Sequence, residues 1–309
     1  MSDVGHKKTL SISEVKKALV IFVALGALFS AAASLMVINL GLNRHYVAIL
    51  MWSPGIAALL TCRIMKLDIG TLGWKWGKGR WQWIAFLTPI TYGLIAYFII
   101  WTAGFGGVPD PKFLEEVGYH LGLVGWTPMA TVLIGVLIFG AVGMIWHVGS
   151  SLGEEIGWRG FLTPQLLRIT SFPIASLITG LAWAVWHMPI IYFTKYNAGP
   201  VDLHLQMANF TLMAVSISFI MTYFLLKTGS LWSATIIHAA HNAYILSILQ
   251  PMTIQYDQTW RFANEFGFVL PLVTAAFGLY FWYRARQEGL DRRSEPTPQP
   301  TPEPTAESD

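Results

Sequence analysis

The sequence of 309 residues contains a single cysteine, Cys62, and few charged residues. A lone cysteine excludes an intramolecular disulfide and a cysteine-rich metal site. Charged residues make up 12% of the chain and apolar residues 54%, more than a soluble chain of this length could bury in one core. The sequence also lacks an internal repeat typical of inverted-repeat transporters. Its net charge of +3 gives no reason to expect a nucleic-acid partner.

Long apolar runs are what the sequence has instead. About 20 apolar residues are enough to cross roughly 30 Å of hydrocarbon as a helix. We therefore predict an all-α polytopic membrane protein, whose transmembrane helices, about eight in number, enclose a polar cavity open toward the cytoplasm. The predicted spans cover residues 18–40, 45–65, 82–102, 128–150, 172–193, 208–226, 230–250 and 266–283.

The distribution of lysine and arginine predicts the orientation, because cytoplasmic loops carry the excess of both. With the amino terminus inside, sixteen of the twenty basic residues lie on the cytoplasmic side. We therefore expect both termini in the cytoplasm and, as the location, a bacterial plasma membrane. The opposite side holds the remaining basic residues and several acidic ones, namely Arg44, Lys112, Lys195, Arg261, Asp110, Glu115, Glu116, Asp202, Asp257 and Glu265.

The two ends of the chain are predicted to lie outside the membrane domain of residues 18–286. Residues 1–17 form a cytoplasmic segment, and the proline-rich residues 287–309 form a disordered tail with nothing to bury. The first apolar run also resembles a secretory signal, with small residues from Ser30 to Ser34. It continues through Ile38, longer than a signal core, so we expect it to be a span.

Ionisable residues interrupt the apolar runs in three places, and the first holds two adjacent carboxylates. Residues four apart share a helical face, so Glu155 is predicted to pair with Arg159. Glu154 lies five residues before Arg159 and points away, which leaves it free to face a cavity as a general base. The alternative is a surface helix whose first turn carries both glutamates.

The other two places supply histidines and an amide. His187 lies deep in the fifth predicted span, and His238 and Asn242 share one face of the seventh. Polar groups at this depth need a partner or a water-filled cavity. We interpret His241 as structural and His147 as a helix-packing residue.

The depth of Glu154 poses a geometric problem. A straight span from Pro128 would carry Glu154 about 39 Å along the helix, near or past the membrane face. The helix must therefore tilt, start later or break. We predict a kink between Gly149 and Gly153 that turns Glu154 back into the bundle.

These three segments resemble the motifs of the CPBP family of intramembrane proteases, which includes CAAX prenyl endopeptidases and bacterial relatives linked to bacteriocin processing and immunity. The family pattern has two glutamates, three residues and an arginine, then an aromatic residue three residues before a histidine, then a histidine three residues before asparagine or aspartate. Here the aromatic residue is Trp183, where the family often has phenylalanine. The matching residues are Glu154, Glu155, Arg159, Trp183, His187, His238 and Asn242.

The resemblance implies hydrolysis of a peptide bond, with a protease core at about residues 128–250. It implies Glu154 as base, His187 as the residue that orients the water, and His238 and Asn242 as an oxyanion hole. Glu155 and Arg159 would fix the helix that carries Glu154, without contacting the substrate. The expected partners are membrane lipids and a peptide or membrane-protein substrate, which the family allows to be prenylated.

A metal-dependent variant stays open at this stage. Glu154, His187 and His238 would form a zinc ligand set, with Glu155 as the base. No His-Glu-x-x-His motif is present, and asparagine is a poor zinc ligand, so we favour a reaction that requires no cofactor. No Gly-x-Ser-x-Gly motif surrounds Ser150 and Ser151, which disfavours a covalent intermediate.

A second functional class is a membrane protein without enzymatic activity. It would be a transporter that uses Glu154 and the histidines as a proton relay, or an immunity protein that binds a partner. The amide of Asn242 and the arrangement of Glu155 with Arg159 favour the hydrolase, since a relay requires neither.

Overall fold

The computed structural model describes residues 10–197 and 199–291, so most of the predicted tail lies outside the described residues. Helices make up about four fifths of this part of the chain, and its only extended pairing is an isolated bridge between Gly107 and Ile254. The predicted all-α class is confirmed.

Within the described residues, six helices are long and apolar enough to cross a membrane. The other two predicted spans are also helical: α9 (Leu231–Ala240) continues into the π-helix η3 (His241–Leu249), and α11 is Val269–Gln287. Short elements are η1 (Ile69–Thr71), α4 (Pro111–Leu121) and α10 (Thr259–Phe262). The six apolar helices are α1 (Ile12–Leu40), α2 (Arg44–Ile64), α3 (Gly79–Thr102), the segment Pro128–Leu167, α7 (Phe172–Phe193) and α8 (Leu203–Thr228).

Local capping explains where several helices begin. Ser11 and Glu14 form a reciprocal capping box, so α1 begins at Ile12, earlier than the predicted residue 18. The Thr127 side chain accepts a hydrogen bond from Ala130 and Pro128 occupies the first turn, which fixes the start of α5 where the sequence predicts it.

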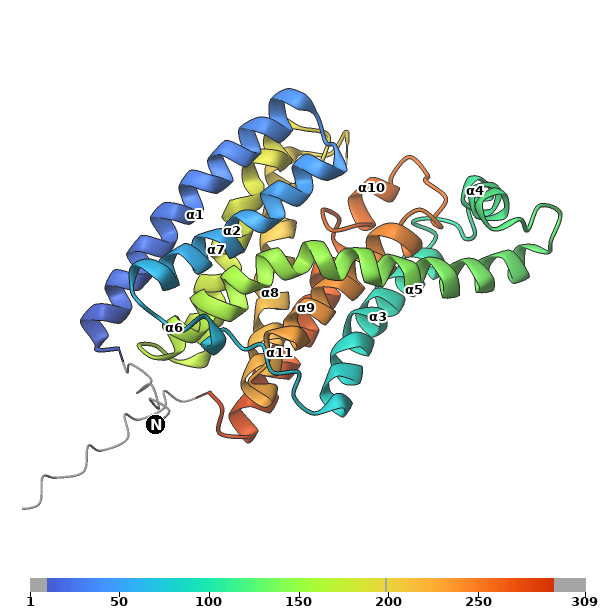
Figure 1. The fold of residues 1–309 in the computed structure, drawn as a ribbon. Coiled ribbons are helices and arrows are strands. Elements are labelled where there is room, and N and C mark those ends of the chain that lie inside the picture. Colours follow the sequence, from blue (N-terminus) through green and yellow to red (C-terminus); the bar gives the residue numbers. More distant parts are fainter. Residues whose placement is uncertain (1–9, 198, 292–309) are drawn as a thin grey trace, which may run out of the picture.

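The segment Pro128–Leu167 consists of α5 (Pro128–Glu155), the π-helix η2 (Ile156–Leu162) and α6 (Thr163–Leu167). The predicted kink between Gly149 and Gly153 is wrong, because α5 continues through both glycines. A Cβ atom on Gly153 would lie 2.7 Å from the Trp52 ring, so this glycine serves close packing against α2. Figure 1 shows α5 crossing obliquely to α1 and α3, and Glu154 near its carboxyl end is buried.

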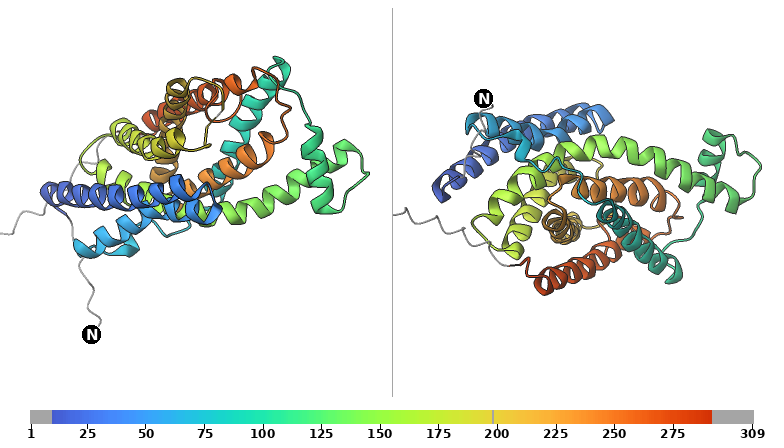
Figure 2. Two further views of the ribbon diagram at one scale, coloured as in Figure 1. Left: turned by 90° about the horizontal axis from the view of Figure 1, so that it is seen from above. Right: turned by 60° about the horizontal axis from the view of Figure 1, so that its bottom comes forward.

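The helices form one bundle from which a single arm projects. α1 and α2 lie side by side, and α8 packs between α7 and α11. In Figures 1 and 2, α4 and the first turns of α5 extend to one side. Leu133, Leu137 and Ile145 of α5 are exposed, as are Val20 and Leu28 of α1, which suits surfaces that face lipid.

Candidate active site

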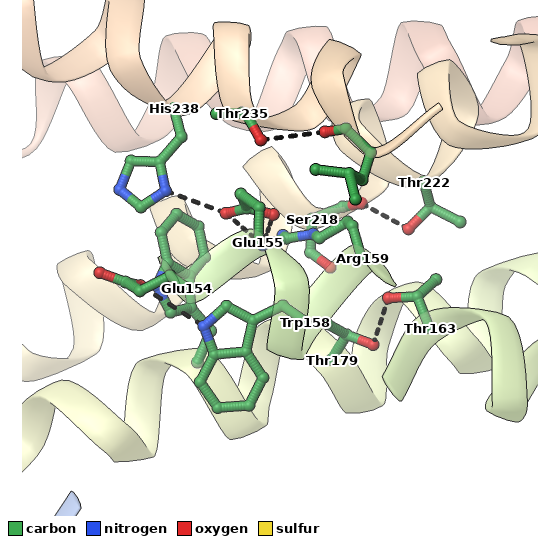
Figure 3. Close-up of polar contacts among 12 residues, drawn as sticks. Glu154, Glu155, Trp158, Arg159, Thr163, Thr179, Ser218, Thr222, Thr235 and His238 are labelled. Carbon is green, nitrogen blue, oxygen red and sulfur yellow. Dashed lines mark hydrogen bonds and ion pairs between the residues drawn. The ribbon is translucent and has the colours of Figure 1, made fainter. Parts of the chain in front are cut away.

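The two adjacent glutamates at the end of α5 point in different directions (Figure 3). Glu154 is buried and accepts a hydrogen bond from the Trp183 indole at 2.7 Å and a longer one from Trp158 at 3.4 Å. Both indoles bind Oε2 of Glu154, so Oε1 is left for a ligand. Glu154 lines a cavity between the helices, as the sequence predicts.

Glu155 points toward Arg159 and His238 instead. Both Glu155 oxygens accept hydrogen bonds from Arg159 Nη1, at 3.2 and 3.1 Å, which confirms the predicted pair. Oε1 of Glu155 also lies 2.9 Å from Nδ1 of His238. Removing one partner of a buried ion pair typically costs about 3–5 kcal/mol. Glu155 thus links the end of α5 to α9 through two buried contacts.

Arg159 is fully buried in the π-helix η2 and is held on both sides. Its guanidinium carbon lies 4.9 Å from the centre of the Trp183 ring, in cation–π geometry. Its Nε and Nη2 have no hydrogen-bond partner among the described residues. Arg159 therefore fixes both Glu155 and the indole that contacts Glu154.

His187 lies on α7 with its ring packed among aromatic side chains. Its Nδ1 lies 2.9 Å from the Trp183 carbonyl oxygen, which can only accept, so Nδ1 donates and Nε2 keeps a lone pair in the neutral ring. Phe210 and Trp186 contact the ring with centroid separations of 4.8 and 4.6 Å. These contacts hold the ring in place at the cavity wall.

His238, Asn242 and His187 all line the same cavity as Glu154, which has a volume of about 250 Å³. The structure therefore brings together the four residues that the sequence singles out. Within the described chain, the Asn242 side chain makes no hydrogen bond, and Nε2 of His238 is also without a protein partner. The arrangement offers one carboxylate oxygen, two imidazole nitrogens and an amide to a ligand.

A buried pair of a glutamate and a histidine at the cavity was missed by the sequence analysis. Glu265, assigned there to an acidic outer loop, is buried and lies 3.1 Å from Nε2 of His241. Its other oxygen accepts a hydrogen bond of 2.8 Å from Tyr196, and Nδ1 of His241 lies 2.7 Å from the Tyr92 hydroxyl. His147, interpreted as a packing residue, also lines the cavity and lies 3.2 Å from Ser247. No spacing pattern joins these residues in the sequence, so only their apolar surroundings could have indicated them.

The cavity lies toward one end of the bundle. Three of its lining residues come from connections at that end: Leu42 before α2, Tyr196 after α7 and Glu265 before α11. The lysine and arginine distribution assigns this end to the side opposite the cytoplasm. In this fold, a cavity open to the cytoplasm and cytoplasmic termini therefore exclude each other.

A zinc site needs three or more protein ligands around one ion. No group of three or more His, Cys, Asp or Glu side chains in residues 10–197 and 199–291 is placed to hold a metal ion. Glu154, His187 and His238 therefore do not form a ligand set in this arrangement.

One family model and two known proteins are similar to parts of this chain. Residues 139–244 match the family model described as type II CAAX prenyl endopeptidase Rce1-like. CAAX prenyl protease 2 of Methanococcus maripaludis is 33% identical over 134 residues, which cover 41% of this chain and 45% of that protein. The matched range includes every residue of the three motifs described in the sequence analysis. These two matches support a CPBP-type intramembrane protease in this part of the chain.

A further similar protein comes from a bacterium. The uncharacterized protein YyaK of Bacillus subtilis is 29% identical over 161 residues, which cover 50% of this chain and 46% of that protein. The chain thus spans less than half the length of the curated relatives that it matches. The family match lies within residues 128–250, where the sequence analysis expects the protease core.

Proposed function

We propose that this chain is an intramembrane endopeptidase in which Glu154 activates a water molecule. The observation that carries the proposal is the position of Glu154, buried at the cavity wall with two indoles on Oε2 and with Oε1 unbound. A carboxylate held in this way is oriented, yet keeps one basic oxygen for a proton.

In the proposed reaction, water binds between Oε1 of Glu154 and Nε2 of His187. Glu154 takes one proton as the water oxygen attacks the carbonyl carbon of the scissile peptide bond. The hydrogen bond from Nδ1 of His187 to the Trp183 carbonyl supports this step, since it leaves Nε2 as an acceptor for the second water proton.

The negative charge on the carbonyl oxygen needs donors. His238 donates from Nε2 only as imidazolium, and the adjacent Glu155 favours that form. The unbound amide of Asn242 supplies a second donor. When the tetrahedral intermediate collapses, the C–N bond breaks and Glu154 returns its proton to the leaving amine. One such donor is typically worth about 10²–10³ in rate.

The test uses the purified protein in lipid nanodiscs with a fluorogenic peptide, both prenylated and unmodified. Glu154→Gln should lower kcat by about 10²–10⁴-fold, the usual contribution of a general base. Asp257→Asn, at an exposed position, serves as the control and should cleave at the wild-type rate. Unchanged cleavage in Glu154→Gln, with both variants folded, would contradict the proposal and favour the transporter or immunity class.

A metal requirement has a separate measurement. We propose that no cofactor is needed, so cleavage should survive dialysis against a chelator, and elemental analysis should find less than stoichiometric zinc. Loss of cleavage on chelation, restored by added zinc, would overturn this part.

The substrate and the location are proposed more broadly. The similar protein from Methanococcus maripaludis is named as a CAAX prenyl protease, which supports a prenylated peptide as one substrate. We place the protein in the plasma membrane of a bacterium. The lysine and arginine distribution supports the placement of both termini in the cytoplasm.

A further inference from the structure

The connection from α10 to α11 carries Glu265 to the cavity in a fixed backbone conformation. Asn264 has a φ of 62°, a left-handed conformation that is uncommon for residues other than glycine, and its side chain accepts a hydrogen bond of 2.8 Å from the Phe266 amide. The Phe266 carbonyl accepts a further hydrogen bond of 2.9 Å from Asn209 of α8. These contacts hold the connection in a costly conformation, with Glu265 buried at the cavity.

Both carboxylate oxygens of Glu265 are occupied. Two donors on separate oxygens favour the ionised carboxylate, which can only accept. Tyr196 therefore donates its hydroxyl proton to Oε2 at 2.8 Å, and His241 donates from Nε2 to Oε1 at 3.1 Å. In the neutral ring, Nδ1 of His241 is then an acceptor, and the Tyr92 hydroxyl donates to it at 2.7 Å. One chain of directed hydrogen bonds thus joins α3, η3 and the connections before α11 and after α7.

The occupied oxygens separate Glu265 from the proposed general base. Glu154 keeps Oε1 unbound, whereas a carboxylate that accepts on both oxygens orients its partners and is not placed to take a proton from water. Stability alone does not account for Glu265 either, because apolar residues of similar volume often replace a buried charged pair without loss. These two points favour a role in fixing the position of its partners.

The first partner, His241, is the residue at which α9 passes into the π-helix η3. π-helices are rare and mostly a single turn long, so the nine residues of η3 depend on contacts with their surroundings. His241 is held from two sides, by Tyr92 and Glu265, and the next residue is Asn242. Among the described residues, the Asn242 side chain has no hydrogen bond of its own, so the backbone at His241 sets where its amide lies.

The second partner, Tyr196, lies beside His187. Their ring centroids are 6.3 Å apart, and the ring planes differ by 27°. The Tyr196 ring also meets the Phe266 ring edge-on, with centroids 5.4 Å apart. Tyr196 is therefore fixed both at its hydroxyl and at its ring, and through it Glu265 acts on the imidazole that is proposed to orient the water.

We infer that Glu265 is a positioning residue for the proposed reaction. Through His241 it sets the start of η3, and with it the proposed oxyanion donor Asn242. Through Tyr196 it sets the ring of His187. The inference rests on the proposed function for the roles of these two residues, and it assigns Glu265 no contact with the reacting atoms.

Two substitutions at Glu265 separate its hydrogen bonds from its charge. Glu265→Ala removes both bonds, whereas Glu265→Gln can keep them, because the amide oxygen accepts from His241 and the amide nitrogen donates to the Tyr196 hydroxyl. In nanodiscs with the fluorogenic peptide, Glu265→Ala should lower kcat about 10–100-fold with little change in KM, as expected when reacting groups are misplaced. Glu265→Gln should bring kcat back to within about threefold of wild type. A loss that Glu265→Gln does not restore overturns the inference.

Coupling to Asn242 distinguishes positioning from a purely structural role. In an Asn242→Ala background, Glu265→Ala should cost a smaller factor in kcat than in the wild-type chain, since residues that act through one another are not additive. A structural role predicts the same factor in both backgrounds, and that result overturns the inference. Tyr196→Phe removes one of the two hydrogen bonds and should lower kcat by less than Glu265→Ala. If Glu265→Ala does not fold, Tyr196→Phe and Tyr92→Phe carry the test, because both keep the ring.

A structural control comes from a hydrogen bond of the same kind away from the cavity. Trp101 donates to Thr253 at 3.0 Å, and neither residue lines the cavity. Trp101→Phe should lower the melting temperature and leave kcat at the wild-type value. A fall in kcat as large as that of Glu265→Ala would show that kcat responds to any lost contact, which overturns the inference.

Hydrogen exchange, measured by mass spectrometry in nanodiscs without peptide, does not depend on cleavage. Glu265→Ala should speed amide exchange in residues 241–249 and 194–197, and Glu265→Gln should leave it as in wild type. If the chain cleaves no peptide but exchange responds in this way, the proposed function fails and the positioning of both segments by Glu265 stands. Wild-type exchange of both segments in Glu265→Ala overturns the inference.

Discussion

Trp183 is the residue that joins Glu154, the proposed general base, to its surroundings. Its indole donates to Glu154, its carbonyl accepts from His187, and its ring covers Arg159. The family pattern often has phenylalanine here, which keeps the ring and loses the donor.

Trp183→Phe should therefore lower kcat about tenfold, by removing one hydrogen bond to a charged group, while KM changes little. The expected loss is smaller than that of Glu154→Gln because the carbonyl contact to His187 is retained. Steady-state cleavage of the fluorogenic peptide measures it. A loss as large as that of Glu154→Gln would show that the indole does more than orient the carboxylate.

At the residue scale, local spacing was enough for part of the site. The four-residue spacing predicted the pair of Glu155 and Arg159, and the same rule placed His238 and Asn242 on one wall. The contacts of Glu265 were not predicted because its partners, His241 and Tyr196, lie far from it in the sequence. Such pairs follow from tertiary packing, which no local pattern encodes.

At the element scale, the close contact of α2 with α5 positions Glu154. A Cβ atom on Gly153 would lie 2.7 Å from Cγ of Trp52 and 2.8 Å from its Cα, so the helices would have to separate. Gly149, one turn earlier on α5, has nothing within 4 Å of its Cβ position.

Gly153→Ala should thus destabilise the protein by about 1–3 kcal/mol through overpacking and also reduce cleavage. Gly149→Ala is the matched control and should stabilise by about 0.5–1 kcal/mol, as expected when glycine is removed from a helix interior. Thermal unfolding in detergent measures both. Equal melting temperatures for the two variants would contradict the close approach of α2 and α5.

The carboxyl end of α11 is tied to α8 by an ion-pair cluster. Glu288 lies 2.6 Å from both Lys227 and Arg284 and accepts a hydrogen bond from Tyr223. Burial raises the pKa of Glu288, but the contacts with Lys227, Arg284 and Tyr223 outweigh it and hold the pKa below its ordinary value.

A carboxylate whose pKa is lower in the folded state stabilises the fold above its unfolded pKa of about 4.3. This contribution disappears as the pH falls through the folded pKa. Glu288→Gln should therefore cost about 1 kcal/mol at pH 7 and nothing in strong acid. Melting temperatures recorded against pH test this, and a difference that persists below both pKa values would assign the effect to packing.

The positions of the helices were predictable from the apolar runs. Irregularities within the helices were not. The helix start at Pro128 followed from local capping. The predicted kink was inferred from the depth of Glu154 along a straight helix, but α5 continues through this stretch and Gly153 provides space for Trp52. The π-helical segments η2 and η3 have no composition that distinguishes them from α-helix, so the sequence did not indicate them.

For the whole molecule, the orientation in the membrane decides which compartment supplies the substrate. The structure ties the cavity mouth to the connection before α2, opposite the end that carries the connection between α2 and α3. From the charge distribution we expect the mouth to face away from the cytoplasm.

Cysteine labelling in intact cells measures this, because Cys62 is buried and should not react. Leu42→Cys should react with a membrane-impermeant maleimide from outside, and Gly79→Cys only after the membrane is opened. The reverse pattern would place the mouth in the cytoplasm and both termini outside.

The π-helices η2 and η3 also bear on how the chain can change length. Each hydrogen bond in a π-helix spans one residue more than in an α-helix, so a stretch of this kind can lose a residue and become α-helical. By contrast, deleting one residue within α5 would rotate Glu154 by about 100° about the helix axis, relative to the residues that precede the deletion. Relatives that differ by single-residue insertions or deletions within these helices should therefore carry them after Arg159 in η2 or after Asn242 in η3, where the gap leaves the reacting groups in register.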